Sequence, residues 1–379
     1  MMRTRISDHR QFAIPAFAFL GFLALASNVL ANPNGEPDIP TIRSVPEPRS
    51  VEQEIKLAND YLAGRGVVRD FKQSAYWFEK AAKQGDPQAQ MQIGYFYDAG
   101  VGVPKDPELA AHWYQLAASG GVAAANVNLG VLYFWGIGVK KNEQLAIQLF
   151  RGAAKHKSGL ADCYLGDVYY QGAAVPRDAA AAEQWYVKGV ELHNPQAEYN
   201  LGLLFFDRPD HVQDLRKAAT LFRKSAEAGY VPAMYSLGLL LARNPGLSKS
   251  ADEAITLLND SASAGTWKSS VVLGVLARDG QAGLQDSGAA YYHFRVAMLQ
   301  GGEDAKKRLG NDIHKLSSSL GPERTTALDS QAENWYQQHH IVLEFVYKTG
   351  KNRTGFPDYA LTNPENGTHT MQMLPAQPN

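Results

Sequence analysis

The sequence predicts an all-α solenoid, in which helical hairpins stack one on the next, on three observations. The first is a period of 36 residues that extends over most of the 379-residue chain. The second is a helix-capping residue that returns once in every period, and the third is a glycine that returns inside the other helix. Repeats of about 20 to 50 residues are typical of solenoids, because a unit of that size cannot bury its apolar face without neighbours.

A glycine preceded by a large apolar residue marks one position of the period. Within a helix, glycine costs about 1 kcal/mol relative to alanine, so its return in every unit indicates that a second helix approaches closely there. We call the helix that carries this glycine helix A. The glycines are Gly94, Gly130, Gly166, Gly202, Gly238, Gly274 and Gly310.

A short polar residue predicts the start of the second helix of each unit, helix B. Asp, Asn and Ser are preferred N-caps because their side chains accept hydrogen bonds from free backbone N–H groups. Pro107 follows one of them at the first helical position, where its missing N–H costs nothing. The predicted caps are Asp70, Asp106, Asn142, Asp178, Asp214, Ser250 and Asp286.

Further glycines predict where the helices end. Helix A is expected to end at a glycine turn such as Gly100-Val101-Gly102-Val103, because glycine tolerates the positive φ of a tight turn. Helix B is expected to end at a C′ glycine, and each unit is therefore a hairpin of helix A, a glycine turn and helix B. The glycines expected at the end of helix B are Gly85, Gly121, Gly229, Gly265 and Gly301.

The first 31 residues predict a secretory signal peptide. Three arginines among the first ten residues precede an apolar run over residues 12–25, and small residues follow. We expect cleavage before Asn32; an uncleaved N-terminal anchor is the alternative. Residues 32–50 are rich in proline and are expected to form an extended leader. The protein is therefore expected in the periplasm or outside the cell, with no stable membrane span after cleavage.

Two segments of the chain resemble a known family. Residues 76–86, which begin with Tyr76-Trp77-Phe78, and residues 93–103, which end with the glycine turn quoted above, are similar to the Sel1-like repeat. That repeat is related to the tetratricopeptide repeat, and the resemblance extends over residues 51–310. It implies a right-handed superhelix of about seven to eight hairpins. It also implies a protein–protein interaction scaffold, often exported in bacteria, with no shared enzymatic activity.

The regular period does not fill the whole chain. We expect seven Sel1-like repeats over residues 51–302, although residues 207–210 and 244–246 replace the glycine turn in the fifth and sixth. A divergent eighth unit and a C-terminal capping helix are expected over residues 303–346, because the terminal repeats of a solenoid usually differ from the internal ones. The polar, proline-bearing residues 347–379 are expected to form a disordered tail.

The sequence contains no motif that predicts catalysis or a cofactor. It lacks the metalloprotease His-Glu-x-x-His, the hydrolase Gly-x-Ser-x-Gly and the phosphate-binding Walker loop. Lys348-Thr349-Gly350 resembles one β-lactamase motif, but no Ser-x-x-Lys supplies a nucleophile. Cys163 is the single cysteine, and the formal net charge of −1 does not favour nucleic acid. We therefore assign no catalytic, cofactor-binding or metal-binding residue.

Helix A lines the concave face of tetratricopeptide repeats, and the resemblance places a binding surface on the same helix here. Positions one, four and five after the helix-A glycine are expected to point inward, and they combine aromatic rings with carboxylates. Aromatic anchors with polar surroundings are typical of binding patches, and the carboxylates favour a basic or amide-rich partner segment. Packing of the aromatic rings between adjacent A helices is the alternative. The candidate partner-binding residues are Tyr95, Asp98, Trp135, Asp167, Tyr170 and Asp207.

The function expected from these features is a non-catalytic scaffold of the bacterial envelope. A rigid concave wall would dock a protein or peptide partner without having to order itself first. Two alternatives remain open: an envelope enzyme or peptidoglycan- or β-lactam-binding protein, and a secreted host-interaction factor. The sequence assigns neither the identity of the partner nor an oligomeric state.

Overall fold

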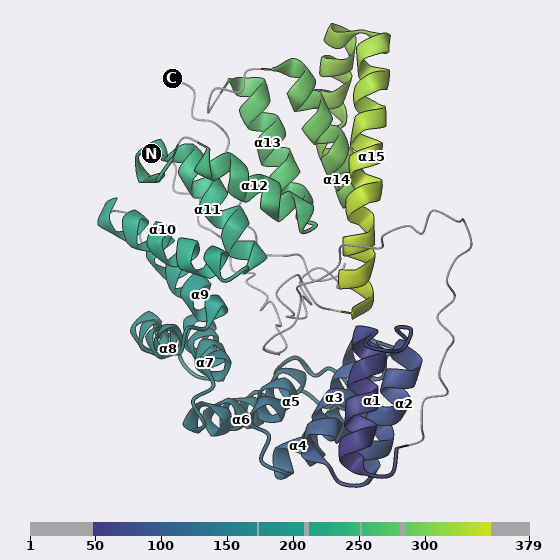
Figure 1. Cartoon of the computed structure of the whole chain (residues 1–379). Helices are drawn as coiled ribbons and strands as arrows, with labels where there is room; N and C mark the ends of the chain where they lie inside the picture. Colours follow the sequence, from purple (N-terminus) through teal and green to yellow (C-terminus); the bar gives the residue numbers. More distant parts are fainter. Residues whose placement is uncertain (1–47, 173, 208–211, 251, 281–285, 350–379) are drawn as a thin grey trace, which may run out of the picture. The chain divides into compact units, whose positions relative to one another are not determined.

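The computed structural model describes residues 48–172, 174–207, 212–250, 252–280 and 286–349 (Figure 1). Every regular element among them is a helix, which confirms the predicted all-α fold. The predicted signal peptide, most of the leader and the tail beyond Thr349 lie outside these residues. The chain divides between Leu149 and Phe150 into two compact units, the N-terminal unit and the C-terminal unit.

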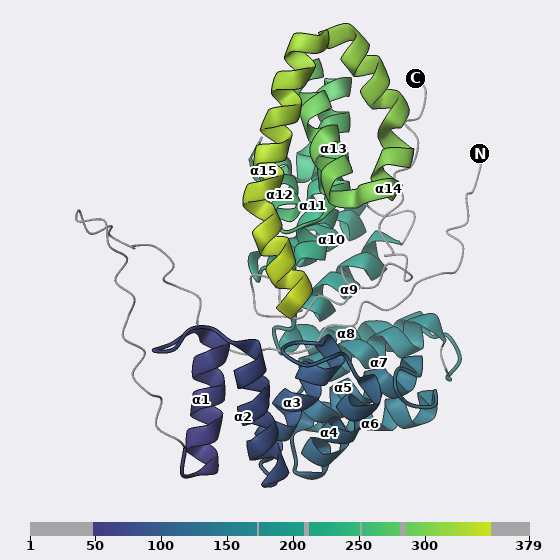
Figure 2. The same ribbon diagram turned by 90° about the vertical axis from the view of Figure 1, so that its right-hand side faces the viewer.

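The N-terminal unit consists of short helices that pack side by side in chain order (Figure 2). A helices alternate with B helices, as the period predicts. Each of these helices has 13 residues, so each period of 36 leaves ten residues for the two connections. The A helices are α1 (Val51–Ala63), α3 (Pro87–Ala99) and α5 (Ala123–Trp135); the B helices are α2 (Phe71–Lys83), α4 (Pro107–Ser119) and α6 (Glu143–Lys155), and α6 continues beyond Leu149.

The C-terminal unit repeats this alternation and then departs from it. A short 3-10 turn, η1 (Pro245–Leu247), stands in the connection of the sixth repeat, where the glycine turn is missing from the sequence. The A helices are α7 (Gly159–Gln171), α9 (Pro195–Phe206), α11 (Val231–Arg243) and α13 (Trp267–Asp279); the B helices are α8 (Ala179–Glu191), α10 (Val212–Glu227) and α12 (Glu253–Ser263); the last two helices are α14 (Ser287–Leu320) and α15 (Pro322–Thr349).

Most of the predicted helix-B caps are confirmed by side-chain hydrogen bonds to the first turn of the helix. Asp106, for example, accepts from the Leu109 N–H at 3.0 Å. The same bond forms at the caps of α2, α6, α8 and α14: Asp70, Asn142, Asp178 and Asp286.

Two predicted caps are wrong, and both lie in repeats that lack the glycine turn. Asp214 is buried inside the first turn of α10, which begins earlier, at Val212. Ser250 precedes α12, which begins later, at Glu253, after η1 has taken up part of the connection. The altered turn therefore shifts the start of the following helix in either direction.

The close approach predicted at the helix-A glycine is confirmed in several repeats. A Cβ atom added at Gly94 would lie 2.8 Å from the ring of Tyr114, and one at Gly202 would lie 2.7 Å from the ring of Phe222. A leucine takes the place of the ring in the sixth repeat, where the added atom on Gly238 would lie 2.8 Å from Leu258. Gly310 differs from these glycines, since nothing lies within 4 Å of an added Cβ there.

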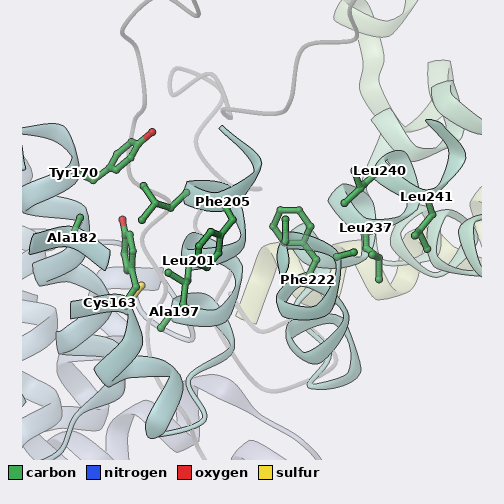
Figure 3. Packing of buried hydrophobic residues seen from close by; sticks show 14 of the residues in the cluster. Cys163, Tyr170, Ala182, Ala197, Leu201, Phe205, Phe222, Leu237, Leu240 and Leu241 are labelled. Atoms are coloured by element: carbon green, nitrogen blue, oxygen red, sulfur yellow. The ribbon is translucent and has the colours of Figure 1, made fainter. Parts of the chain in front are cut away.

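The core of the C-terminal unit continues from one hairpin to the next. Figure 3 shows buried side chains of α7, α9, α10 and α11 in contact, with Cys163 at one end and Leu241 towards the other. Phe222 lies between them with no exposed surface. A succession of contacts of this kind is what a solenoid core requires, because each hairpin buries its apolar face against the next.

The regular repeats end at a kink in α14. Gly302 has non-helical backbone angles, φ 56° and ψ −135°, at the position where the sequence places the end of the seventh repeat. The second half of α14 then packs along α15, which buries Ala332 and continues to Thr349 (Figure 2). This helix therefore includes residues 347–349, where the sequence predicts the tail to begin.

Candidate functional site

The candidate residues stand on the A helices, and we use the name A face, separately in each unit, for the side of these helices that carries them. It is defined by the positions one, four and five residues after the helix-A glycine. In the N-terminal unit the candidates are Tyr95 and Asp98 on α3 and Trp135 at the end of α5; in the C-terminal unit they are Asp167 and Tyr170 on α7 and Asp207 at the end of α9.

Asp98 binds a tyrosine of its own repeat in the N-terminal unit. The hydroxyl of Tyr114, from α4, donates to Asp98 Oδ2 at 3.4 Å, and both side chains are buried. Burial, followed by the nearby Asp98 carboxylate, holds the pKa of Tyr114 well above its ordinary value, so its hydroxyl remains a donor. Tyr95 lies in the same cluster, and burial followed by Asp98 likewise raises its pKa. These side chains hold α3 against α4.

Trp135 is the accessible aromatic residue among the candidates of the N-terminal unit. It is the last residue of α5 and is half-buried, whereas Tyr95 is only 6% exposed. The Phe134 ring meets the indole edge-on, with ring centroids 5.2 Å apart and an angle of 75° between the ring planes. An edge-to-face contact of this kind fixes the orientation of the indole while leaving part of its surface open to solvent.

Asp167 joins two repeats of the C-terminal unit. Its Oδ1 accepts from the Tyr186 hydroxyl of α8 at 2.6 Å and from Asn200 Nδ2 of α9 at 2.8 Å. Asn200 Nδ2 also lies 3.3 Å from the sulfur of Cys163. Asp167 is 8% exposed, so its carboxylate mainly serves polar groups inside the stack.

Tyr170 and Asp207 form the second link between α7 and α9. The Tyr170 hydroxyl donates to Asp207 Oδ2 at 2.9 Å, and the guanidinium of Arg177 lies 5.2 Å from the centre of the tyrosine ring. Tyr170 is 9% exposed, whereas Asp207 is half-buried. Of the three candidates in this unit, Asp207 therefore presents the most surface to solvent.

The structure thus brings Tyr170 together with Asp207 and gives Asp98 and Asp167 tyrosine partners from helix B. Sequence reasoning missed those partners, although a signal exists in the period. The helix-B position that faces the glycine carries Tyr114 and Tyr186 in the second and fourth repeats and phenylalanine or leucine in the others: Phe78, Phe150, Phe222, Leu258 and Phe294. A hydroxyl at an otherwise apolar core position predicts an acceptor nearby.

A family model describes most of the repeats. The Sel1 repeat matches residues 54–86, 87–122, 123–158, 159–194, 195–230 and 231–266, which together are more than half of the chain. The chain belongs to the Sel1 repeat family. This confirms the resemblance noted in the sequence, and Sel1 repeat proteins generally mediate protein–protein interactions as non-catalytic scaffolds.

Solved structures with the Sel1 fold are similar to this chain. A Sel1 repeat protein from Oxalobacter formigenes is 28% identical, covers 65% of this chain over 98% of its own length and gives a TM-score of 0.56. A protective antigen of uropathogenic Escherichia coli, with an SLR fold, is 23% identical over 76% of this chain and 69% of its own, with a TM-score of 0.40. A comparison with curated protein sequences gives no match.

A second polar column of the Sel1 repeats, which the sequence analysis did not single out, lies between helices A and B. In the first repeat the buried Glu54 pairs with Lys80 at 3.2 Å. Asp162 and Glu198 take the same position in the fourth and fifth repeats, and burial raises the pKa of both carboxyl groups, that of Asp162 to about 6. The sequence signal for this column is a carboxylate that recurs at one position of helix A, as Glu54, Asp162 and Glu198.

The described residues of these Sel1 repeats form neither a metal site nor a membrane-spanning helix. Within the described ranges, no three His, Cys, Asp or Glu side chains gather closely enough to hold a metal ion. The thiol of Cys163 is buried, and burial raises its pKa well above the ordinary value. Nor does the described part of the chain contain a helix of the length and apolar character that crossing a membrane requires.

Proposed function

We propose that this Sel1 repeat protein is a scaffold of the bacterial envelope that binds a protein or peptide partner on its A face. The general role of the family in protein–protein interactions supports the binding function. The predicted signal peptide over residues 1–31 supports the envelope location. We choose the A face as the binding surface because it combines aromatic and acidic side chains on helices that are fixed by hydrogen bonds to neighbouring helices.

The observation that carries the proposal is the division of the six candidates into supporting and accessible residues. Tyr95, Asp98, Asp167 and Tyr170 are all less than a tenth exposed. They hold each A helix against helix B or against the next repeat. Trp135 and Asp207 stand at the ends of their helices with more exposed surface, where a partner would contact them.

Rigidity of the support favours binding. A partner that docks on a preorganised surface does not lose affinity to the ordering of side chains in the scaffold. The hydrogen bonds at Asp167 and at Tyr170 supply this rigidity in the C-terminal unit. Substitution of Trp135 or Asp207 should therefore weaken partner binding and leave the fold intact. Substitution of the four buried candidates should instead destabilise the fold.

The test is capture of a partner by crosslinking in intact cells. Trp135→Ala removes an accessible A-face ring, and Tyr76→Ala is the matched control, because Tyr76 is 55% exposed on helix B of the same unit. We expect Trp135→Ala to reduce capture of the crosslinked partner while Tyr76→Ala retains it, with both variants keeping the helical circular dichroism of the parent. Equal capture by both variants would remove Trp135 from the site.

The envelope location is tested separately by cell fractionation. We expect the native chain in the periplasmic or extracellular fraction, shortened at its N-terminus. Replacing the three arginines among the first ten residues with glutamine should retain the full-length chain in the cytoplasm, because the basic n-region directs export. A native chain found intact in the cytoplasm would contradict the proposed location.

A further inference from the structure

The last helix of the C-terminal unit, α15, is longer than the helix segments of α14 that it packs against. Two contacts fix its register along the first half of α14, and in each the partners are 38 residues apart: Arg324 with Asp286 at 3.7 Å, and Asp329 with the Tyr291 hydroxyl at 3.1 Å. The same offset places the kink at Gly302 beside residue 340. The second half of α14 runs antiparallel to α15 from the turn at Gly321, and equal counting from that turn also places Gly302 beside residue 340.

Residues 340–349 of α15 therefore extend past both halves of α14, and we call them the overhang. Figure 2 shows this end of α15 continuing beyond the kink of α14. Ten helical residues are about 15 Å long. Six of the seven residues from Ile341 to Tyr347 are apolar, and Glu344 is the seventh. A helix with apolar residues all round it is normally buried, so the overhang needs a partner that α14 does not supply.

The spacing of the buried residues of α15 indicates what kind of partner fits. Steps of three and four residues are typical of a helix that packs lengthwise along another helix. Val342 and Val346 continue such steps into the overhang. The stripe that packs on α14 thus continues after α14 has ended, and a second helix would fit it. The at least partly buried residues that form the stripe before the overhang are Thr325, Leu328, Ala332, Trp335 and His339.

The charges of the overhang favour an identical copy as that second helix. In an antiparallel pair the middle of the overhang lies opposite itself. Glu344 of each copy then lies within about one helical turn of Lys348 of the other. Opposite charges therefore meet twice, once on each side of the two-fold axis. A parallel pair would instead bring the two α14 kinks side by side.

The apolar surface of the overhang is large enough for a dimer. An aromatic side chain buries about 150 to 250 Å², so Phe345 and Tyr347 of two copies offer about 600 to 1,000 Å². The aliphatic residues of both copies add to this area. The sum reaches the range of about 1,200 to 2,000 Å² that specific, stable interfaces bury.

We infer that the overhang is a self-association site, through which two copies of this protein form an antiparallel dimer. The site is separate from the A face, so self-association and partner capture can each fail without the other. A dimer presents every A face twice. Two linked binding sites raise the avidity for a partner that also has two sites, without any new contact.

The test is sedimentation velocity of the purified protein over a series of concentrations. We expect a dimer that dissociates on dilution. Val346→Glu places a charge within the stripe and should raise the dissociation constant at least tenfold. Gln338→Glu is the matched control, because it adds the same charge at an exposed position of α15 just before the overhang, and it should leave the dimer unchanged. Both variants should keep the helical circular dichroism of the parent.

Two results of this experiment would overturn the inference. One is a native protein that stays monomeric at every concentration, and the other is a dimer that Val346→Glu leaves intact. If the monomer also sediments with phosphatidylglycerol vesicles and Val346→Glu abolishes this binding, the overhang would be assigned to a membrane surface instead.

A charge swap tests the antiparallel pairing without removing an apolar residue. Glu344→Lys alone brings like charges together twice and should weaken the dimer about tenfold, and Lys348→Glu alone should do the same. The double variant Glu344→Lys, Lys348→Glu makes the charges opposite again and should recover the native dissociation constant. A double variant as weak as either single variant would refute the proposed dimer.

Discussion

The fourth and fifth repeats have the same period and the same pair of helices, but they pack the helix-A glycine against different rings. In the fourth repeat the ring is Tyr186, whose hydroxyl donates to the buried Asp167. In the fifth it is Phe222, which lies against Tyr199 with ring centroids 5.5 Å apart. Leu203 takes the place of Asp167 there. One hairpin therefore tolerates either a polar or an apolar version of the same contact.

In these two repeats, the helix-B ring and the residue that follows the helix-A glycine change together. A buried hydroxyl without an acceptor loses the free energy of its hydrogen bonds to water, and a buried carboxylate without donors loses more. The pair Tyr186 and Asp167 and the pair Phe222 and Leu203 each satisfy this condition. A tyrosine combined with a leucine, or a phenylalanine combined with an aspartate, would leave a buried polar group without its partner. Such a combination therefore tests the comparison directly.

The largest effect is expected when the polar version is broken on one side. Asp167→Leu leaves the Tyr186 hydroxyl and the Asn200 amide without their shared acceptor. We expect a loss of about 3 kcal/mol in the free energy of unfolding, since each orphaned buried group costs about 1 to 3 kcal/mol. Urea unfolding followed by circular dichroism measures it.

The double variant Asp167→Leu, Tyr186→Phe serves as the control for that loss. It copies the fifth repeat into the fourth and should recover more than half of the lost stability, because only the Asn200 amide has then lost an acceptor, and that amide keeps its contact with the Cys163 sulfur. A double variant no more stable than Asp167→Leu alone would show that the tyrosine and the aspartate do not act as a pair.

A smaller loss is expected when a methyl group is forced between helix A and the ring. Gly202→Ala would place its Cβ 2.7 Å from the Phe222 ring, and overpacking of this kind costs about 1 to 3 kcal/mol. Gly310→Ala is the matched control, because nothing lies within 4 Å of its Cβ. Gly310→Ala should stabilise α14 by about 1 kcal/mol, because alanine favours a helix more than glycine does. Thermal unfolding that ranks the two variants in the other order would contradict the role of the glycine.

The period made the hairpins, most caps and the close approach at glycine predictable from sequence, because each follows from local chemistry that recurs. The caps at Asp214 and Ser250 were not predictable, since the lengths of two irregular connections decide where α10 and α12 begin. The candidate site was predictable only as a set of positions. Whether Asp167 faces solvent or Tyr186 depends on a neighbour from another helix, and a single column of the repeat does not contain that information.

A pH-dependent difference is expected at the second polar column. Burial raises the pKa of Asp162 from 3.8 to about 6, against the opposing effect of Lys188 and with a further contribution from Glu191. Because the folded-state pKa is the higher one, the stabilising contribution is complete below about pH 3.8 and disappears as pH rises through about 6.

Asp162→Asn mimics the protonated carboxyl and tests this dependence. Asn126 already takes the same position in the third repeat, so the side chain suits the fold. Relative to the native chain, the variant should gain about 1 kcal/mol in the free energy of unfolding at pH 7.5 and nothing at pH 4. A difference that is the same at both pH values would exclude titration of Asp162 as its cause.

The smallest effect is expected where helix B ends. Gly229 ends the fifth repeat with φ 84°, a conformation that suits glycine, but the third repeat holds Lys157 at the equivalent position with φ 57°. A residue with a side chain loses about 1 kcal/mol of stability in the left-handed region. Glycine avoids this strain, but the greater conformational freedom of glycine in the unfolded chain cancels part of the gain. Lys157→Gly should therefore stabilise the protein by about 0.5 kcal/mol, visible as a raised urea midpoint with an unchanged slope. Gly229→Ala should lower the midpoint, and a fall in both variants would show that the residue at this position is chosen for something other than its backbone conformation.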